Sequence, residues 1–374
     1  MNYTIPLQPI AQDIETKPVL KKLALARAAL AELKGAADVI PNEVIILNTL
    51  SLQEAKDSSA IENIITTHDE LYSSDSVARQ FTSTAAKEVH NYATALKEGF
   101  KVVKQTGLLT SNHIIQIQTT LEENNAGFRK LPGTALKNQQ TGEVVYTPPQ
   151  HIDEITSLMT NLEVFMNDNS VCDWDVLVKM AVIHHQFESI HPFYDGNGRT
   201  GRIINILYLV KEGLLNLPIL YLSRYINQNK ATYYRLLQQT RDTQKWEPWL
   251  LYMLDAVEKT ALQTSTLVRD IKSLMLRHKQ RIRTELPKIY SQDLINNLFQ
   301  HPYTKIDFLV KELGITRKTA AKYLEELCNV NLLTKHKLGK DNYYLNNDLF
   351  NLLSDVSSLR VENEESVPIR TIQG

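Results

Sequence analysis

The sequence predicts a mainly α-helical protein that is divided into several domains. Most of the 374 residues lie in segments where apolar side chains recur at helical spacing. One short segment near residue 140 is instead rich in Gly, Pro, Thr and β-branched residues. After Pro287 the pattern changes to short helices followed by a basic, β-prone stretch. A helical core that carries a β-hairpin, followed by a separate C-terminal domain, explains all three observations.

The composition is that of an ordinary soluble globular protein. Hydrophobic residues make up 43% of the chain, charged residues make up 22%, and the formal net charge is -1. This balance gives no general reason to expect a nucleic acid or a membrane as a partner. The two cysteines, Cys172 and Cys328, lie far apart, which fits a reducing cytosol better than a disulfide framework. Residues 1–20 have no signal-peptide pattern, so we expect a cytoplasmic protein.

The N-terminal part is expected to form helices. Residues 19–33 are rich in Ala, Leu and Lys at helical spacing, and Gly35 and Pro41 mark the end of that helix. Asn42 is a suitable N-cap for a second helix, which runs towards Lys56. The whole predicted division is an N-terminal helical region (1–104), a core (105–260), a helical linker (261–286), a C-terminal domain (287–350) and a polar tail (351–374).

Residues 128–149 break the helical pattern. They contain Gly133 and Gly142 and end in two prolines. Their β-prone run is Val144, Val145, Tyr146 and Thr147. This composition predicts a small hairpin with its turn near residues 138–142. An isolated hairpin is marginal in water and needs a surface to pack on, and these residues alone support a plain surface hairpin as well as a functional one.

The densest group of chemically useful residues lies between two buried helices. Helical periodicity covers residues 174–190 and resumes at Ile203, and the stretch between them reads HPFYDGNGRTGR. It holds a histidine, a carboxylate, a Gly-Asn-Gly turn and two arginines. Each type has a separate use in moving a phosphorus-containing group: proton abstraction, metal binding, a backbone anion cradle and cationic clamps.

The position of this motif suits an anionic ligand. It begins a helix, where unpaired N–H groups and the helix dipole favour anions, and glycine lets the backbone approach them closely. Arg199 and Arg202 are three residues apart, so they share a helix face and can both grip polyphosphate oxygens. Asp195 can hold Mg²⁺. His191 is placed to take a proton from an attacking hydroxyl.

Two other interpretations of the same stretch fit less well. Its glycines satisfy G-x-G-x-x-G, but a dinucleotide fold needs a strand before the first glycine, and the period there is helical. His185, Glu188 and His191 form an H-x-x-E-x-x-H string, which suggests zinc. That spacing matches neither H-E-x-x-H nor H-x-x-E-H, so we do not expect a zinc site.

The stretch, read as H-x-F-x-D-G-N-G-R-x-x-R, resembles the signature of the Fic family of nucleotidyl transferases at every motif position. The resemblance implies a helical core that transfers AMP from ATP to a hydroxyl side chain of a protein. It makes His191 the general base, Asp195 the Mg²⁺ ligand and Asn197 a contact to the α-phosphate region, with Arg199 and Arg202 on the β- and γ-phosphates. The implied ATP-binding residues are Gly196, Asn197, Gly198, Arg199, Thr200, Gly201 and Arg202.

The resemblance also suggests roles for three segments outside the motif. The hairpin resembles the family's flap, which aligns a target chain by strand addition. Tyr233 and Tyr234 match the region that lines the adenine pocket in relatives, although core packing explains them nearly as well. Residues 58–63 resemble the inhibitory motif [S/T]-x-x-x-E-[G/N] through Ser58, Glu62 and Asn63.

Glu62 is the residue that this last likeness makes important. A glutamate delivered beside two arginines pairs with one of them, removes a phosphate clamp and repels the polyphosphate. The hypothesis is that Glu62 pairs with Arg202 and holds the enzyme nearly silent. The simpler alternative is that Glu62 is a surface charge on a helix.

The C-terminal domain has the pattern of a winged helix. Three short helices, at residues 291–299, 305–313 and 316–328, precede a two-stranded wing at residues 332–345. Residues of the types that contact DNA are Thr316, Arg317, Lys318, Thr319, Lys322, Lys335, Lys337 and Lys340. Four acidic residues offset this charge: Asp307, Glu312, Glu325 and Glu326.

The function predicted from the sequence is therefore a protein adenylyltransferase that is autoinhibited through Glu62. It uses ATP and Mg²⁺ and modifies a Ser, Thr or Tyr hydroxyl of a target protein that docks on the flap. The alternatives are a DNA-binding regulator with a nucleotide-sensing core and an enzyme that removes AMP, with Glu62 orienting water. The target, self-modification, homo-oligomerisation and the signal that relieves inhibition stay open.

Overall fold

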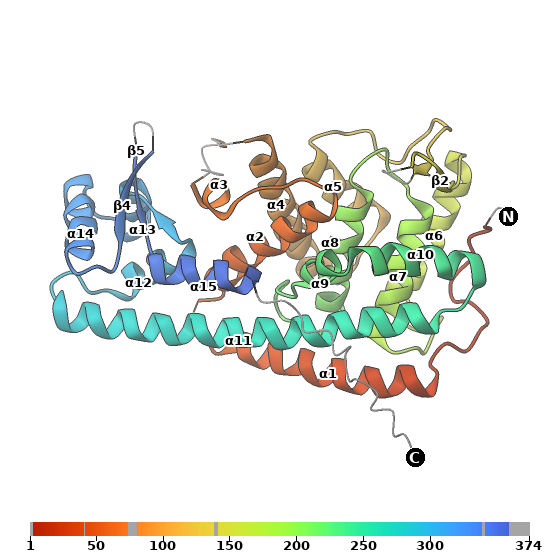
Figure 1. Cartoon of the computed structure of the whole chain (residues 1–374), viewed down its shortest axis with the longest axis horizontal. Coiled ribbons are helices and arrows are strands. Elements are labelled where there is room, and N and C mark those ends of the chain that lie inside the picture. Colours follow the sequence, from red (N-terminus) through yellow and green to blue (C-terminus); the bar gives the residue numbers. More distant parts are fainter. Residues whose placement is uncertain are drawn as a thin grey trace, which may run out of the picture.

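The computed structural model describes residues 3–40, 42–73, 81, 83–137, 141–338 and 341–358. Figure 1 shows helices along the whole molecule and two small groups of strands. The mainly α-helical fold class predicted from the sequence is therefore confirmed. Among the described residues, no helix is long and apolar enough to cross a membrane.

The N-terminal region contributes two long helices. Helix α1 (Lys17–Asp38) lies along α11 (Glu247–Glu285) for much of its length (Figure 1). Gly35 was wrongly predicted to end α1. It lies inside the helix, with open space where a side chain would be, and a glycine there costs only some helix propensity. Pro41, the second expected stop, falls outside the described residues.

Helix α2 (Glu43–Ile61) carries the predicted inhibitory segment at its C-terminal end. It begins as expected, because Oδ1 of Asn42 accepts a hydrogen bond from the N–H of Val44 at 3.0 Å. It runs past Lys56 to Ile61 and packs against α4 (Thr84–Thr106) and α9 (Leu222–Gln228). Helix α2 is therefore part of the core, and its last turn reaches the centre of the molecule.

Two helices form the centre of the core. Almost every side chain of α7 (Val176–Ile190) is buried, and so are those of α8 (Asn197–Lys211) up to Leu209. Helices that are buried all round are expected only where other helices cover every side. The surrounding helices include α3 (His68–Ser73), α5 (Ser111–Glu122), α6 (Ile152–Asn167) and α10 (Lys230–Thr243).

The predicted hairpin is present and packs on this core. Strands β1 (Leu136–Lys137) and β2 (Val144–Tyr146) are antiparallel, and residues 138–140 of the expected turn lie outside the described residues. Thr147 follows β2 and is not part of it. Tyr146 holds the hairpin down: its hydroxyl donates to the carbonyl of Ser189 at 2.8 Å, and its ring lies 4.1 Å from the guanidinium of Arg241.

Helix α11 connects the core to the C-terminal domain without interruption. The predicted core and the predicted helical linker meet at residue 260, which lies inside this one helix, Glu247–Glu285. The domain that follows consists of α12 (Gln292–Gln300), β3 (Tyr303–Thr304), α13 (Ile306–Leu313), α14 (Arg317–Asn329), β4 (Thr334–Leu338) and β5 (Asp341–Leu345). This is the expected order of three helices and a two-stranded wing, with β3 as an additional strand beside β5.

The chain then returns towards the core. Helix α15 (Asn347–Ser358) packs on α11, so the polar tail predicted from residue 351 is helical as far as Ser358. Residues 359–374 lie outside the described residues. Helix α12 contacts α2 (Figure 1). The ring of Phe350 on α15 lies 6.3 Å from that of His68 on α3. The C-terminal domain therefore touches the helix that Glu62 caps.

Candidate active site

The loop between α7 and α8 holds the predicted catalytic histidine in a strained position. His191 caps α7, and its N–H donates to the carbonyl of Phe187 at 2.9 Å. Its backbone is left-handed, with φ 48° and ψ 59°. Non-glycine residues adopt this region rarely, and such strain concentrates at functional sites. Phe193 is fully buried and anchors the loop in the core.

Asn197 fixes the shape of this loop. Its Oδ1 accepts a hydrogen bond from the N–H of Phe193, and its Nδ2 donates to the carbonyl of the same residue, both at 2.9 Å. The side-chain amide is thus fully engaged with the backbone, while the contact to an α-phosphate region stays a prediction. Helix α8 begins at Asn197, so the motif supplies the first turn of this helix.

The three glycines of the motif each lie against a carboxyl group of the protein. A Cβ on Gly196 would collide with Glu122, one on Gly198 with Glu62, and one on Gly201 with Glu188. The absence of side chains therefore lets acidic groups come up to the first turns of α8. Thr200 is fully buried there. The same space, next to the unpaired N–H groups of a helix N-terminus, suits an anionic ligand.

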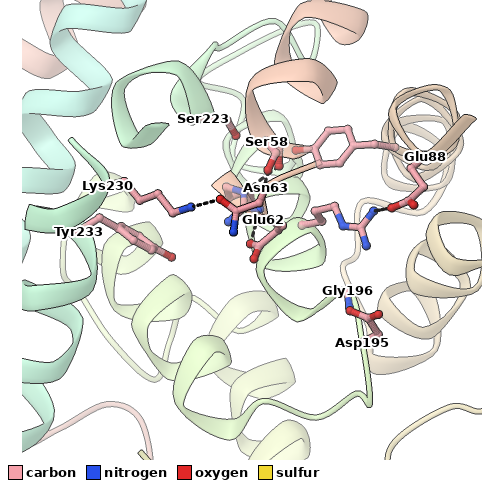
Figure 2. A network of polar contacts seen from close by, with 12 residues as sticks. Ser58, Glu62, Asn63, Glu88, Asp195, Gly196, Ser223, Lys230 and Tyr233 are labelled. Carbon is pink, nitrogen blue, oxygen red and sulfur yellow. Dashed lines mark hydrogen bonds and ion pairs between the residues drawn. The ribbon is translucent and has the colours of Figure 1, made fainter. Parts of the chain in front are cut away.

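Arg202 is held by the end of α2. Its Nη2 donates to Oε1 of Glu62 at 2.8 Å and to the carbonyl of Ser58 at 3.0 Å, and its Nε donates to Oγ of Ser58 at 2.7 Å. The Arg202 side chain is only 1% exposed, whereas that of Glu62 is 34% exposed. The structure thus brings together the predicted inhibitory residues and one of the two predicted phosphate-binding arginines (Figure 2).

The residue after Glu62 ties α2 to a second helix. Asn63 has a left-handed backbone with φ 64°, and its Oδ1 accepts a hydrogen bond from Nζ of Lys230 at 3.1 Å (Figure 2). Lys230 begins α10, on the other side of the space in front of α8. The predicted inhibitory segment therefore bridges α8 and α10.

Glu62 is ionised in this setting. Burial raises the pKa of its carboxyl, but the charge and hydrogen bond of Arg202, helped by Arg199 and Lys230, leave the pKa below its ordinary value. For Arg202, burial lowers the pKa and the charge of Glu62 raises it, with a net rise. Both partners are therefore charged at neutral pH.

The sequence did not indicate the partners of Arg199. Its Nη1 donates to Oε2 of Glu88 on α4 at 3.0 Å (Figure 2). Its Nη2 donates to Oε1 of Glu122 on α5 at 2.7 Å. The Arg199 side chain is 4% exposed. Neither glutamate belongs to a motif, and only the fold brings them to α8. Both arginines of the motif are therefore bound to carboxylates of the protein in this state.

His191 is suited to accept a proton. Burial lowers the pKa of its ring to about 4, and the positive charges of Arg129 and Arg241 add to this, against an opposing effect of Glu62. The imidazole is therefore neutral at pH 7. A neutral ring has one nitrogen free to act as a base.

Arg129 is a second residue that the sequence did not reveal. Its Nε donates to the carbonyl of His191 at 2.8 Å and its Nη2 to that of Ile190 at 3.5 Å, and Nη2 also donates to the carbonyl of Pro149. Its own N–H donates to the carbonyl of Pro192 at 2.8 Å. The guanidinium thus joins the loop between α7 and α8 to the C-terminal end of the hairpin.

A cavity of about 1110 Å³ lies between the hairpin, the motif and α10. Its lining includes Glu62, Glu188, His191, Gly198, Arg202 and Tyr234. The volume and the mixture of aromatic and charged groups suit a ligand the size of a nucleotide. Tyr234 is 45% exposed, whereas Tyr233 is 1% exposed, with its ring against Trp249 and its hydroxyl 2.8 Å from Nε2 of His184. Tyr233 is therefore mainly a core residue.

Comparison with protein families accounts for most of the chain. Residues 108–209 match the Fic/DOC family, and residues 20–101 match the N-terminal region of that family. This chain belongs to the Fic/DOC family. Residues 274–349 match the C-terminal domain of SoFic-like protein adenylyltransferases.

Curated relatives of this Fic chain are named as protein adenylyltransferases. A probable protein adenylyltransferase of Aquifex aeolicus is 37% identical over 82 residues, which are 22% of this chain and 25% of the relative. The protein adenylyltransferase Fic of Aedes aegypti is 25% identical over 174 residues, which are 46% of this chain and 33% of the relative. The matches thus span a third or less of the length of these relatives.

Solved structures show the same fold. A Fic family protein from Desulfovibrio desulfuricans superposes with a TM-score of 0.56 at 20% identity, over 90% of this chain and 98% of that one. Fic-1 from C. elegans gives a TM-score of 0.51 at 17% identity, over 67% of this chain and 73% of that one. At these identities, the likeness concerns the fold alone.

The oxygen ligands of the Fic motif suit Mg²⁺ better than zinc. Asp195 is exposed and uses Oδ1 to accept the N–H of Gly196 at 2.7 Å (Figure 2). Among the described residues, no three His, Cys, Asp or Glu side chains are grouped to hold a metal, and Nε2 of His185 lies 3.2 Å from the carbonyl of Leu237. Mg²⁺ typically binds one or two carboxylates together with substrate phosphates. Asp195 fits that arrangement.

The basic residues of the C-terminal domain are partly neutralised. Arg317 forms an ion pair with Asp307, and Nζ of Lys335 lies 2.6 Å from Oε1 of Glu325. Nζ of Lys322 lies 3.7 Å from Oε1 of Glu326. These pairs weaken the positive face on which DNA binding would depend, because affinity for DNA rests chiefly on unneutralised Lys and Arg. DNA binding by this domain stays a prediction.

Proposed function

We propose that this protein is an adenylyltransferase that transfers AMP from ATP to a hydroxyl group of a target protein, and that the contact of Glu62 with Arg202 inhibits it. The main support is the cavity in which a neutral His191, Arg202 and the edge of the hairpin meet. The names of the relatives support the same reaction.

The proposed reaction is an in-line displacement at the α-phosphorus. The hydroxyl oxygen of the target forms a bond to this phosphorus, the bond from the phosphorus to the α,β-bridging oxygen breaks, and pyrophosphate leaves. The hydroxyl proton passes to a ring nitrogen of His191, which is unprotonated at neutral pH. Asp195 would hold Mg²⁺, which neutralises phosphate charge when bound.

The hairpin is the proposed docking site for the target chain. Val144 and Val145 on β2 are 56% and 47% exposed, whereas Tyr146 holds the strand to the core. A short strand with free edge groups can pair with an extended peptide, and such pairing positions side chains at alternate residues. A hydroxyl residue on that peptide would then face His191. A Ser, Thr or Tyr in an extended segment is the proposed substrate.

The inhibition follows from the use of Arg202. A γ-phosphate that binds Arg202 must displace Glu62, and Glu62 repels the phosphate while it stays. Because Glu62 directly follows the last turn of α2, a small movement of that turn would release the arginine. We therefore propose low activity for the unmodified chain and high activity once Glu62 is removed.

The decisive experiment compares the wild-type chain with Glu62→Gly in Mg²⁺ and ATP labelled at the α-phosphate, with a cell lysate as the source of targets. We expect protein labelling by Glu62→Gly that exceeds the wild-type level at least tenfold. Mass spectrometry then identifies the transferred group and the modified side chain. Absence of any labelled protein, the enzyme included, would refute the proposal.

Two control variants test whether the effect is specific to Glu62 and whether labelling depends on His191. Glu43→Gly makes the same substitution at the exposed start of the same helix, so it should leave labelling at the wild-type level. Glu62→Gly combined with His191→Ala should bind ATP yet label nothing. Labelling that persists in this double variant would show that His191 is not the base.

A further inference from the structure

A buried carboxyl group in the cavity, that of Glu188, has one oxygen atom with no hydrogen-bond partner in the described part of the chain. Glu188 is 8% exposed, and its Oε1 has no hydrogen-bond partner among the described residues. The residue lines the cavity and lies one turn before His191 on α7. The sequence drew attention to it only within the H-x-x-E-x-x-H string, and the zinc interpretation of that string does not explain it.

A buried carboxyl oxygen without a hydrogen bond is unfavourable unless a ligand supplies the missing donor. Burying a carboxyl without a hydrogen bond destabilises the fold, and most buried polar groups in proteins are paired. Burial raises the pKa of Glu188 to about 7, with Arg202 and Arg241 lowering it and Glu62 raising it. A perturbed, unpaired acid in a cleft is a typical candidate for ligand binding.

The neighbours of Glu188 place it beside the expected path of a nucleotide. Its Oε1 faces Gly201 on the first turns of α8, close to where the phosphates would bind. Its charge also acts on Tyr233 and Tyr234 of α10, on the opposite side of the cavity. The carboxyl therefore lies between the phosphate-binding end and the aromatic wall. A nucleotide that spans these two ends would bring its nucleoside half past Glu188.

We propose that Glu188 accepts a hydrogen bond from a donor of the bound nucleoside, either a ribose hydroxyl or the exocyclic amine of the base, and thereby selects which nucleotides this site accepts. The proposal rests on the proposed function, because it takes the cavity to be the nucleotide site. It assigns Glu188 a role in specificity that neither His191 nor the arginines can supply, since they act on the phosphates and the hydroxyl.

A discriminating role has a physical basis. A site built to hydrogen-bond a substrate OH or NH group rejects an analogue that lacks this group much more strongly than an apolar pocket can, because its own polar group is then left buried and unpaired. In either protonation state Glu188 keeps at least one acceptor oxygen. Replacing it with Gln should preserve that acceptor, and replacing it with Ala should not.

The test measures binding rather than turnover. The host protein is the double variant Glu62→Gly/His191→Ala, in which the inhibitory carboxylate is gone and transfer is prevented. Calorimetry at pH 8 in Mg²⁺ compares ATP with 2′-deoxy-ATP, 3′-deoxy-ATP and purine riboside triphosphate, which lacks the 6-amino group. We expect one of the three analogues to bind about 10- to 100-fold more weakly than ATP. Which analogue it is identifies the donor.

The same measurements on Glu188→Ala and Glu188→Gln in that host decide whether Glu188 is responsible. In Glu188→Ala, the affinity for ATP should fall to that for the analogue that the host binds most weakly. The ratio of the two dissociation constants should then approach one. In Glu188→Gln most of the ratio should remain. A merely structural role would lower the melting temperature or weaken every nucleotide alike, and would leave the ratio unchanged.

Two outcomes would overturn the inference in distinguishable ways. If the host binds ATP and the ATP-to-analogue ratios are the same with and without the Glu188 carboxyl, the inference is wrong and the proposed function stands. If the host binds none of the four nucleotides, the cavity is not a nucleotide site and the proposed function fails with it.

Discussion

Oε1 of Glu62 lies 2.8 Å from Nη2 of Arg202, at the point where the last turn of α2 meets the first turns of α8. The arginine is buried, whereas the glutamate is a third exposed on the cavity side. Only the acidic partner can therefore leave without disturbing the core. This asymmetry makes Glu62 the movable half of the pair and Arg202 the fixed half.

Charge on Glu62, rather than its bulk, should govern the inhibition. Glu62→Gln keeps the size of the side chain and one acceptor oxygen but removes the negative charge. That charge both repels phosphate and strengthens the hydrogen bond to Arg202. We expect AMP incorporation by Glu62→Gln to lie between that of the wild type and that of Glu62→Gly. The initial rate of labelling with α-labelled ATP measures this, with Glu43→Gln as the matched control on the same helix. A rate equal to that of the wild type would mean that Glu62 blocks the site by shape alone.

Glu88 and Glu122 are expected to restrain the other arginine. Each accepts one hydrogen bond from Arg199, and both carry negative charge towards the proposed phosphate site. In a Glu62→Gly host, Glu122→Gln should therefore strengthen ATP binding about 3- to 10-fold, because repulsion of the polyphosphate falls. Calorimetry measures the affinity, and Glu123→Gln is the neighbouring control. Weaker binding would show instead that Glu122 holds Arg199 in its binding position.

The sequence predicted the elements around the motif well, and the reason is local. The N-cap at Asn42 and the β-prone run at Val144 are signals that a few neighbouring residues determine. The prediction that Gly35 ends α1 was wrong, because a glycine that is not forced into a left-handed conformation does not end a helix. The boundary placed at residue 260 lies inside α11, which packs against α1 and α15, because a boundary within a continuous helix leaves the helical period unchanged.

The candidate site was predicted only in part for a different reason. His191, Asp195 and the two arginines lie in one short stretch, and Glu62 was found through the resemblance to a family. Glu88, Glu122 and Arg129 lie outside any motif that we used, and they reach the site because α4, α5 and the hairpin base pack around α8. Contacts between residues so far apart in the sequence depend on tertiary packing, which periodicity does not reveal.

Arg129 should affect turnover more than nucleotide binding. Arg129→Lys keeps a positive charge near His191 but loses the planar fork that reaches three carbonyl groups. Leaving these buried carbonyls unpaired should cost about 2 to 4 kcal/mol of unfolding free energy. In a Glu62→Gly host, kcat should fall at least tenfold, because the loop that carries His191 is no longer joined to the hairpin. The Kd of ATP should change little. Urea unfolding, labelling kinetics and calorimetry check the three quantities, and unchanged kcat would refute a positioning role.

Glu54 should make the stability of the protein depend on pH. It is buried on α2, two turns before Glu62, and its oxygens accept hydrogen bonds from Ser223 and from the hydroxyl of Tyr92. Burial raises the pKa of Glu54 to about 8 from 4.5, with the hydrogen bonds of Ser223 lowering it, Asp57 raising it and Arg202 lowering it. The folded state therefore binds this proton more tightly than the unfolded state does. The resulting stability is fully present below about pH 4.5 and is lost as the pH rises through 8.

The substitution Glu54→Gln isolates this effect. The amide keeps the shape and can pair with the hydroxyls of Ser223 and Tyr92, but it does not titrate. Asp57 and Glu188 also have raised pKa values and act in the same direction, so the useful quantity is the difference between variant and parent. The parent should lose up to about 1.4 kcal/mol of unfolding free energy per pH unit relative to Glu54→Gln between pH 5 and pH 8. Urea unfolding across this range measures it, and parallel curves for the two proteins would show that Glu54 is already ionised near pH 5.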